Sequence, residues 1–114
     1  MRIDSYSFGV IKIDGTEYTS DLIVLHKKIK ADWWRKQGHS LVPDDLTDIL
    51  EFKPDVLVVG KGASGMMKVP ADTEKFIQDQ GIELIAEKTS RACEIFNEKI
   101  EKGTKVAGAF HLTC

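Results

Sequence analysis

The residues best suited to chemistry form the glycine-rich loop Gly60–Gly65 (GKGASG), which follows the apolar run Val56–Val59. Glycines leave backbone amides uncovered by side chains, and uncovered amides can hold an anion such as phosphate or carboxylate. The valine-rich run is typical of a strand buried on both faces of its sheet, so other layers must cover both sides of that sheet. The sequence therefore predicts an α/β domain with a candidate ligand site where this strand ends.

The loop also matches the G-x-G-x-x-G pattern of dinucleotide-binding domains, with Glu87 at about the expected distance along the chain. In that pattern the last glycine packs within the helix that follows. Here Met66–Pro70 separates Gly65 from the next predicted helix. A P-loop is excluded because no Gly-Lys-Ser or Gly-Lys-Thr ends the loop. We therefore expect no dinucleotide site and predict no cofactor.

A simpler anion site remains open if the strands that end at Val59 and Ala86 are parallel neighbours in the sheet. The loop would then lie beside the N-terminus of the next helix, where free amides and the positive end of the helix dipole favour an anion. The alternative is architectural: the glycines permit a tight crossover, and Thr89 or Ser90 only caps the helix. The candidate ligand site comprises Gly60, Lys61, Gly62, Ser64, Thr89 and Arg91.

Other catalytic arrangements find little support. The spacings of His26, His39 and His111 match no zinc pattern, and we predict no metal site. Ser64 does not lie in a G-x-S-x-G motif, and Cys93 falls among the apolar positions of a predicted helix, so neither is an obvious nucleophile. His39 is the best single candidate for acid–base chemistry because imidazole titrates near neutrality, the alternative being a surface or capping role.

The adjacent tryptophans Trp33 and Trp34 are a candidate contact for another protein. Neighbouring side chains on an extended segment point to different sides, so one indole can be exposed while the other is buried. An exposed tryptophan beside Arg35 would suit a protein partner. The alternative is that both indoles cover an edge of the core.

Strands dominate the first part of the chain. We predict one strand over Tyr6–Ile13, a tight turn at Asp14-Gly15 and a second strand over Thr16–Thr19. The apolar phase shifts within the first strand, which suggests a bulge near Gly9 or burial on both faces. A further short strand is expected over Leu22–Leu25. The segment 26–40 has no regular pattern.

Helices and strands alternate in the remainder of the chain. Prolines and first-turn carboxylates mark helix starts, and glycines mark helix ends. The expected elements are a short helix from Pro43 to near Lys53, a strand over Val56–Val59, a helix of about ten residues after Pro70, a strand over Ile82–Ala86, a helix from about Ser90 to Lys102 and a strand over Val106–Leu112.

Composition limits the class of protein. The 114 residues suit a single domain, 1–114, with one core, and 42% hydrophobic with 30% charged residues suit a globular protein. A net charge of −2 argues against a nucleic-acid partner. No apolar run approaches the roughly 18 residues of a membrane span, and Met1–Ser5 opens no secretory signal. We therefore expect a cytoplasmic protein without a disulfide and without membrane contact.

Taken together, the chain resembles the Mth-type domain family, which includes small archaeal and bacterial proteins of unknown function and a mitochondrial assembly factor for respiratory NADH dehydrogenase. No single motif is diagnostic, and the resemblance extends over the whole chain. Its features are Tyr6–Gly9 with the Asp14-Gly15 turn, Trp34 with Gly38-His39, Val58–Gly62, Gly81–Glu83 leading to Thr89 and Ala92, Phe96-Asn97 and Val106–Leu112.

The resemblance implies a three-layer α/β fold with a mixed central sheet, flanking helices and an additional antiparallel β layer. It brings no established reaction, and the better-studied members of the family act through association with other proteins. If the family shares a pocket, the matching positions are Gly60, Gly62, Thr89, Ala92 and Asn97. We therefore predict a non-catalytic protein that binds a protein partner or itself. The alternative is an anion-binding or small-molecule-binding domain, or an enzyme, that uses the glycine-rich loop.

Overall fold

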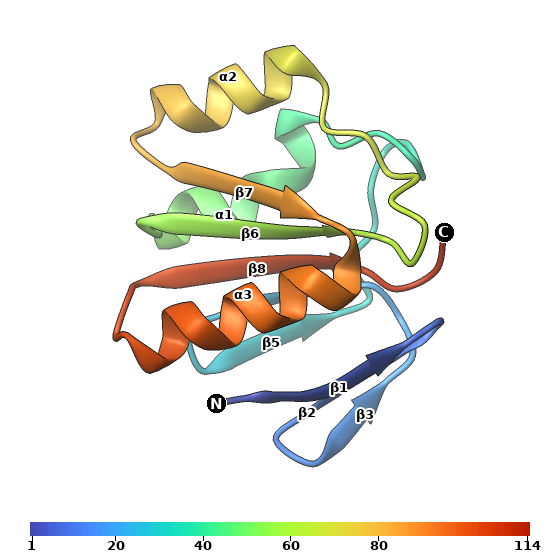
Figure 1. Cartoon of the computed structure of the whole chain (residues 1–114). Coiled ribbons are helices and arrows are strands. Elements are labelled where there is room, and N and C mark those ends of the chain that lie inside the picture. The colour runs from blue at the N-terminus through green and yellow to red at the C-terminus, as the bar shows by residue number, and fades with distance from the viewer.

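Two β-sheets share the chain in the computed structural model, which describes residues 1–114 (Figure 1). The first sheet is antiparallel and has the strand order β1-β2-β3. The second has the order β5-β4-β8-β6-β7, with β6, β7 and β8 parallel to one another and β4 antiparallel to β8. The strands are β1 (Ile3–Ser7), β2 (Val10–Ile13), β3 (Thr16–Tyr18), β4 (Leu22–Leu25), β5 (Lys28–Ala31), β6 (Val56–Lys61), β7 (Glu83–Glu87) and β8 (Val106–His111).

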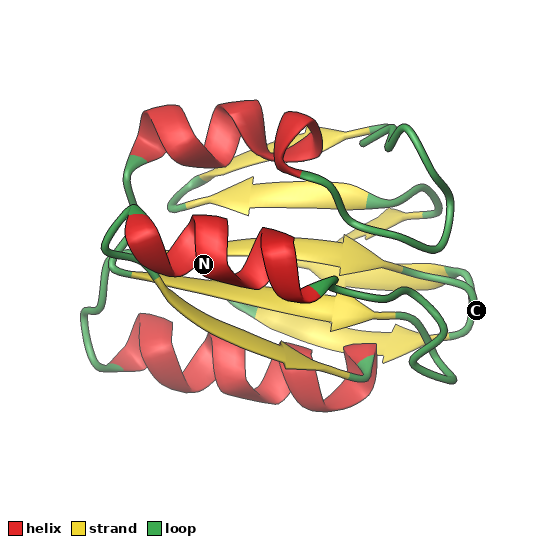
Figure 2. Ribbon diagram, turned by 90° about the horizontal axis from the view of Figure 1, so that it is seen from above, coloured by secondary structure: helices red, strands yellow, loops and turns green.

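Helices cover both faces of the five-stranded sheet, as Figure 2 shows. On one face Ile49 and Ile77 pack with buried side chains of β4, β6 and β8, and on the other face Phe96 does so together with residues of the small sheet. The predicted three-layer α/β fold is thereby confirmed. The helices are a 3-10 turn η1 (Pro43–Leu46), α1 (Thr47–Phe52), α2 (Ala71–Asp79) and α3 (Thr89–Glu101). None of them is both long and apolar enough to cross a membrane.

The prediction of one strand over Tyr6–Ile13 is wrong, because the chain reverses in its middle. β1 and β2 pair as a hairpin with Ser7 opposite Val10, and Gly9 occupies the turn with φ of 80°. The reversal, and not a bulge in one strand, explains the phase shift of the apolar residues. The second predicted turn is present, with positive φ at both Asp14 and Gly15.

The sequence pattern also failed to predict β5. This strand lies at the edge of the large sheet and pairs only with β4, and both of its end residues, Lys28 and Ala31, are exposed. Edge strands carry lysines because these discourage pairing with other chains, so they lack the apolar alternation of inner strands. The remaining predicted elements are present with boundaries shifted by a few residues.

β8 lies at the centre of the large sheet, and all six of its residues are buried. The rings of Phe96 and Phe110 meet edge to face, with their centroids 5.7 Å apart, above Gly108. A Cβ atom at Gly108 would lie 2.8 Å from Phe110 Cζ and 3.1 Å from Phe96 Cδ1. The missing side chain therefore makes room for the aromatic pair.

Replacing Gly108 should test this packing. Gly108→Ala should lower the free energy of unfolding by about 1–3 kcal/mol, because the added methyl group overpacks a filled core. A Cβ atom at Gly38 would meet no heavy atom within 4 Å, so Gly38→Ala should change the value by no more than about 0.5 kcal/mol. Urea unfolding followed by circular dichroism measures both, and equal effects would contradict the packing argument.

Candidate functional site

The glycine-rich loop begins at the C-terminal end of β6, and the C-terminal end of the neighbouring parallel strand β8 lies beside it. β6 and β7 are parallel neighbours with Val59 opposite Ala86, as the candidate anion site requires. Lys61 lies opposite His111 in the pairing of β6 with β8. The amide of Thr89 donates to the carbonyl of Gly62 at 3.1 Å, so the loop does lie against the start of α3.

Protein groups already occupy most of the loop amides. The Gly62 amide donates to Thr89 Oγ1 at 2.8 Å, and the Ala63 and Met66 amides donate to the carbonyls of Thr113 and Cys114 at 2.6 and 3.0 Å. Gly62 has φ of 102°, and a Cβ atom there would lie 2.6 Å from the Cys114 oxygen. The loop is packed against the last residues of the chain, and an anion would have to displace these bonds.

The Thr89 hydroxyl does not cap α3, contrary to one of the sequence interpretations. It is buried, accepts from Gly62 and donates to the His111 carbonyl at 2.6 Å. The N-cap residue is Lys88, and no side chain caps the helix. Gly60 leaves room for this threonine, because a Cβ atom there would lie 2.8 Å from Thr89 Oγ1.

The other predicted ligand residues are dispersed. Ser64 is exposed, and Arg91 is exposed and pairs with Glu94 at 2.9 Å. Asn97 donates to the Ile3 carbonyl and accepts from the Ile3 amide, both at 2.9 Å, so it ties β1 to α3 beside the buried Ala92 and Cys93. The structure brings Gly60, Gly62 and Thr89 together, and the anion site stays a prediction. No cavity is lined by the loop.

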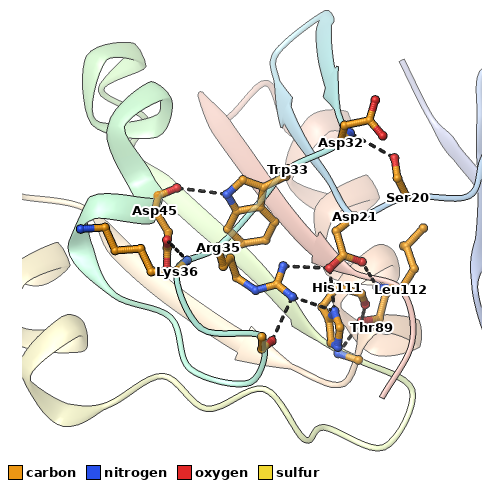
Figure 3. Close-up of polar contacts among 12 residues, drawn as sticks. Ser20, Asp21, Asp32, Trp33, Arg35, Lys36, Asp45, Thr89, His111 and Leu112 are labelled. Carbon is orange, nitrogen blue, oxygen red and sulfur yellow. Dashed lines mark hydrogen bonds and ion pairs between the residues drawn. The ribbon is translucent and has the colours of Figure 1, made fainter.

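A buried cluster of Asp21, Arg35 and His111 lies next to the loop, and sequence reasoning missed it (Figure 3). Asp21 directly precedes β4, Arg35 follows β5, and His111 ends β8. Their side chains are 18%, 5% and 7% exposed. Asp21 Oδ2 lies 2.8 Å from Arg35 Nη1 and 2.7 Å from His111 Nδ1. Their two ion pairs are the ones in which both side chains are less than a fifth exposed.

His111 Nδ1 lies next to one hydrogen-bond acceptor and one hydrogen-bond donor. It lies 2.7 Å from the Asp21 carboxylate, which can only accept, and 3.1 Å from Arg35 Nη2, which can only donate. We place a proton on Nδ1 because the carboxylate contact is the shorter one. In the neutral ring Nε2 is then an acceptor, and it is buried without a partner.

Asp21 has a lowered pKa, so its carboxylate stays ionised at a lower pH than an ordinary aspartate does. Its burial raises the pKa, but hydrogen bonds from His111, from the Leu112 amide and from Arg35 together outweigh that effect. The net pKa therefore lies below the usual value of 3.8. The Leu112 amide donates to Asp21 Oδ1 at 2.8 Å, so both carboxylate oxygens hold the end of β8.

Buried polar groups also order the segment around the tryptophans. The Arg35 guanidinium stacks over the Trp33 ring at 4.8 Å and donates to the Gly38 carbonyl at 3.0 Å. Trp33 Nε1 donates to the Asp45 carbonyl at 3.0 Å. Trp33 is half-buried and Trp34 is 86% exposed, so the two indoles do point to different environments.

The tryptophans share a pocket of about 360 Å³ at the surface with two members of the buried cluster, Asp21 and Arg35. It is lined by Ser20, Asp21, Asp32, Trp33, Trp34, Arg35 and Gly38. The ring of His39 lies outside this lining, with its centroid 5.9 Å from that of His111. No three histidines, cysteines or carboxylates are placed to hold a metal ion together. The pocket therefore combines the polar side chains of Asp21 and Arg35 with two tryptophans.

Comparison with known proteins identifies the chain. Residues 3–111 match the family described as "Protein of unknown function (DUF498/DUF598)". The chain belongs to this family. The match covers nearly the whole chain, and no reaction is attached to the family's description.

Solved structures show the same fold as this DUF498 member. A conserved hypothetical protein from Pyrococcus horikoshii OT3 has a TM-score of 0.83 and 28% identity, with 100% of each chain covered. The protein MT938 has a TM-score of 0.83 and 25% identity over 99% of this chain and 98% of that one. A Mth938-like domain of Bordetella pertussis has a TM-score of 0.70 and 16% identity over 97% and 85%. The predicted membership in the Mth-type family is confirmed.

The cluster of this DUF498 member can be tested through stability. Asp21→Asn should lower the free energy of unfolding at pH 7 by about 2–3 kcal/mol, because it leaves the buried Arg35 without its counter-charge. Since the folded pKa of Asp21 is depressed, its stabilisation is present above pH 3.8 and is lost as the pH falls below that value. The difference between wild type and variant should therefore shrink in acid.

Asp32→Asn is the matched control for this measurement. Asp32 is exposed in the same pocket and makes no ion pair, so the free energy of unfolding of the Asp32→Asn variant should equal that of the wild type. Urea titrations at several pH values measure all three proteins. A pH-independent difference for Asp21→Asn would contradict the role assigned to its charge.

The two cysteines should differ sharply in reactivity. Both are free thiols, and Cys93 is buried whereas Cys114 is exposed. Burial raises the pKa of the Cys93 thiol to about 12, which leaves almost no thiolate at neutral pH. Ellman's reagent should therefore titrate one thiol in the folded protein and two in urea, with Cys114→Ser removing the fast reaction. Rapid modification of two thiols in the folded wild type would contradict this assignment.

Proposed function

We propose that this protein acts without catalysis, by binding another protein through one end of the molecule. The observation that carries the proposal is the distribution of exposed apolar side chains. Trp34, Phe8 and Met66 are the large hydrophobic residues that are exposed, by 86%, 65% and 55%. We call these three side chains, with residues 112–114, the apolar end.

The loops of the apolar end converge on the last residues of the chain. Gly9, next to Phe8, donates to the Leu112 carbonyl at 2.8 Å, and the Met66 amide donates to the Cys114 carbonyl at 3.0 Å. Arg35, next to Trp34, contacts His111. Figure 1 places these loops and the C-terminus at the same end of the sheets. Exposed apolar residues gathered in this way favour a protein interface.

The buried cluster supports the absence of catalysis. A catalytic histidine must reach its substrate, but His111 Nε2 is sealed inside the protein. Cys93 is buried as well, and its raised pKa leaves it a poor nucleophile. Asp21, Arg35 and His111 therefore act as supports that hold the apolar end in shape. The cytoplasmic location and the anion site at the glycine-rich loop remain proposals from the sequence.

Substitutions in the apolar end should remove partner binding. Trp34→Ala should weaken the interaction about 30-fold and Met66→Ser by a smaller factor, because tryptophans buried at an interface contribute most to its binding energy. Quantitative cross-linking in cells measures which proteins are joined to the wild type and to each variant. Phe76→Ala, on α2 outside the apolar end, is the control and should retain the wild-type partners.

Self-association is tested in the same variants by sedimentation. If the partner is a second copy, purified wild type should sediment as a dimer and Trp34→Ala as a monomer. An identical set of cross-linked proteins for wild type, Trp34→Ala and Met66→Ser, with no change in sedimentation, would contradict the proposed function.

A further inference from the structure

The pocket beside Trp34 has firmly held walls. One wall is the segment 20–21, and the other is the segment 32–35. The Asp32 amide donates to Ser20 Oγ at 3.0 Å (Figure 3), and the Trp33 amide donates to the Asp21 carbonyl at 2.9 Å. The volume of about 360 Å³ is enough for one long side chain. The pocket is therefore formed in advance of any ligand.

The accessible charge in this pocket is negative. Its lining contains two carboxylates, Asp21 and Asp32, and one guanidinium, Arg35. Arg35 is matched by Asp21 at 2.8 Å, and its Nε and Nη1 atoms are buried. Asp32 is exposed and makes no ion pair with any residue. An incoming group thus meets a free carboxylate, while the guanidinium stays out of its reach.

The rim of the pocket suits a cation for a second reason. The Trp34 indole is exposed at the rim, and an aromatic face attracts a cationic group that approaches it. The stacking of Arg35 on Trp33 at 4.8 Å shows the same contact already made inside the protein. An anion would find no accessible positive group here and would be repelled by Asp32.

We propose that this pocket binds a lysine or arginine side chain of the protein partner, with Asp32 pairing with the charge and Trp34 stacking on the cationic group. The inference rests on the proposed function, which supplies the protein partner, and it adds that the partner presents a basic residue next to apolar ones. Asp32 lines the pocket, and its backbone φ of 57° is one that aspartate and asparagine adopt more readily than most residues.

A titration with a minimal probe tests the pocket without knowledge of the partner. N-acetyl-arginine-N-methylamide should shift the NMR signals of the Trp34 indole N–H and the Asp32 amide in a saturable way. The citrulline analogue has the same shape without the charge, and it should bind at least about fivefold more weakly. Asp32→Asn should reduce arginine binding by the same factor, since asparagine tolerates the same backbone conformation.

Three results would overturn the proposal. The first is an equal response to the arginine and citrulline probes, and the second is an equal response of wild type and Asp32→Asn. The third is no saturable shift with arginine up to about 50 mM, which corresponds to a binding free energy weaker than about 2 kcal/mol. Asp21→Asn cannot replace Asp32→Asn here, because it disturbs the buried cluster.

Cross-linking of Asp32→Asn separates this proposal from the proposed function. One outcome is that Trp34→Ala and Met66→Ser lose partners while Asp32→Asn retains all of them. That result would support the proposed function and would contradict the proposal that the pocket binds a basic residue of the partner. Loss in all three variants supports both. If arginine binds the pocket but no apolar-end variant loses a partner, the pocket stands and the proposed function fails.

Discussion

The largely buried carboxylate of Asp21 is the constraint on which this end of the molecule depends. A carboxylate that loses most of its contact with water is tolerated only when hydrogen bonds and counter-charges replace its hydration. Asp21 obtains them from His111, the Leu112 amide and Arg35, which belong to segments far apart in the sequence. Satisfying one charge therefore fixes the end of β8, the start of β4 and the segment after β5 against one another. The pocket and the position of Trp34 follow from that arrangement.

Packing at the centre of the large sheet depends instead on small residues that leave room for large side chains. Ala107, Gly108 and Ala109 are small residues in the middle of β8, and large side chains cover them from both faces. The Phe96–Phe110 pair occupies the volume above Gly108. Tight apolar packing in the middle and polar bonding at the edge together give a rigid scaffold with irregular loops at one end. Rigid sheets that carry such loops are the common support of binding surfaces.

Much of the fold could be predicted from the sequence because apolar periodicity reports burial directly. The strands at Leu22–Leu25, Val56–Val59 and Val106–Leu112 and the helices after Pro43, Pro70 and Thr89 were recognised in this way. β5 and the turn at Gly9 were missed, since an edge strand and a tight reversal both disturb the period. The cluster of Asp21, Arg35 and His111 was missed for another reason. Its members meet only through the antiparallel pairing of β4 with β8 and with β5, which no local pattern specifies, although a lone Asp or His bordering an apolar strand is a usable hint.

The bonds made by residues 112–114 have a consequence for the order of folding during synthesis. The Leu112 carbonyl accepts from Tyr6 and Gly9, and the carbonyls of Thr113 and Cys114 accept from Ala63 in the glycine-rich loop and from Met66 just after it. A ribosome makes these acceptors after residues 1–111. Both loops must wait for them, although β6 and β7 can pair earlier. Because the central strand β8 directly precedes these acceptors, the nascent chain can complete its large sheet and its exposed apolar end only together, after residues 106–114 have been made.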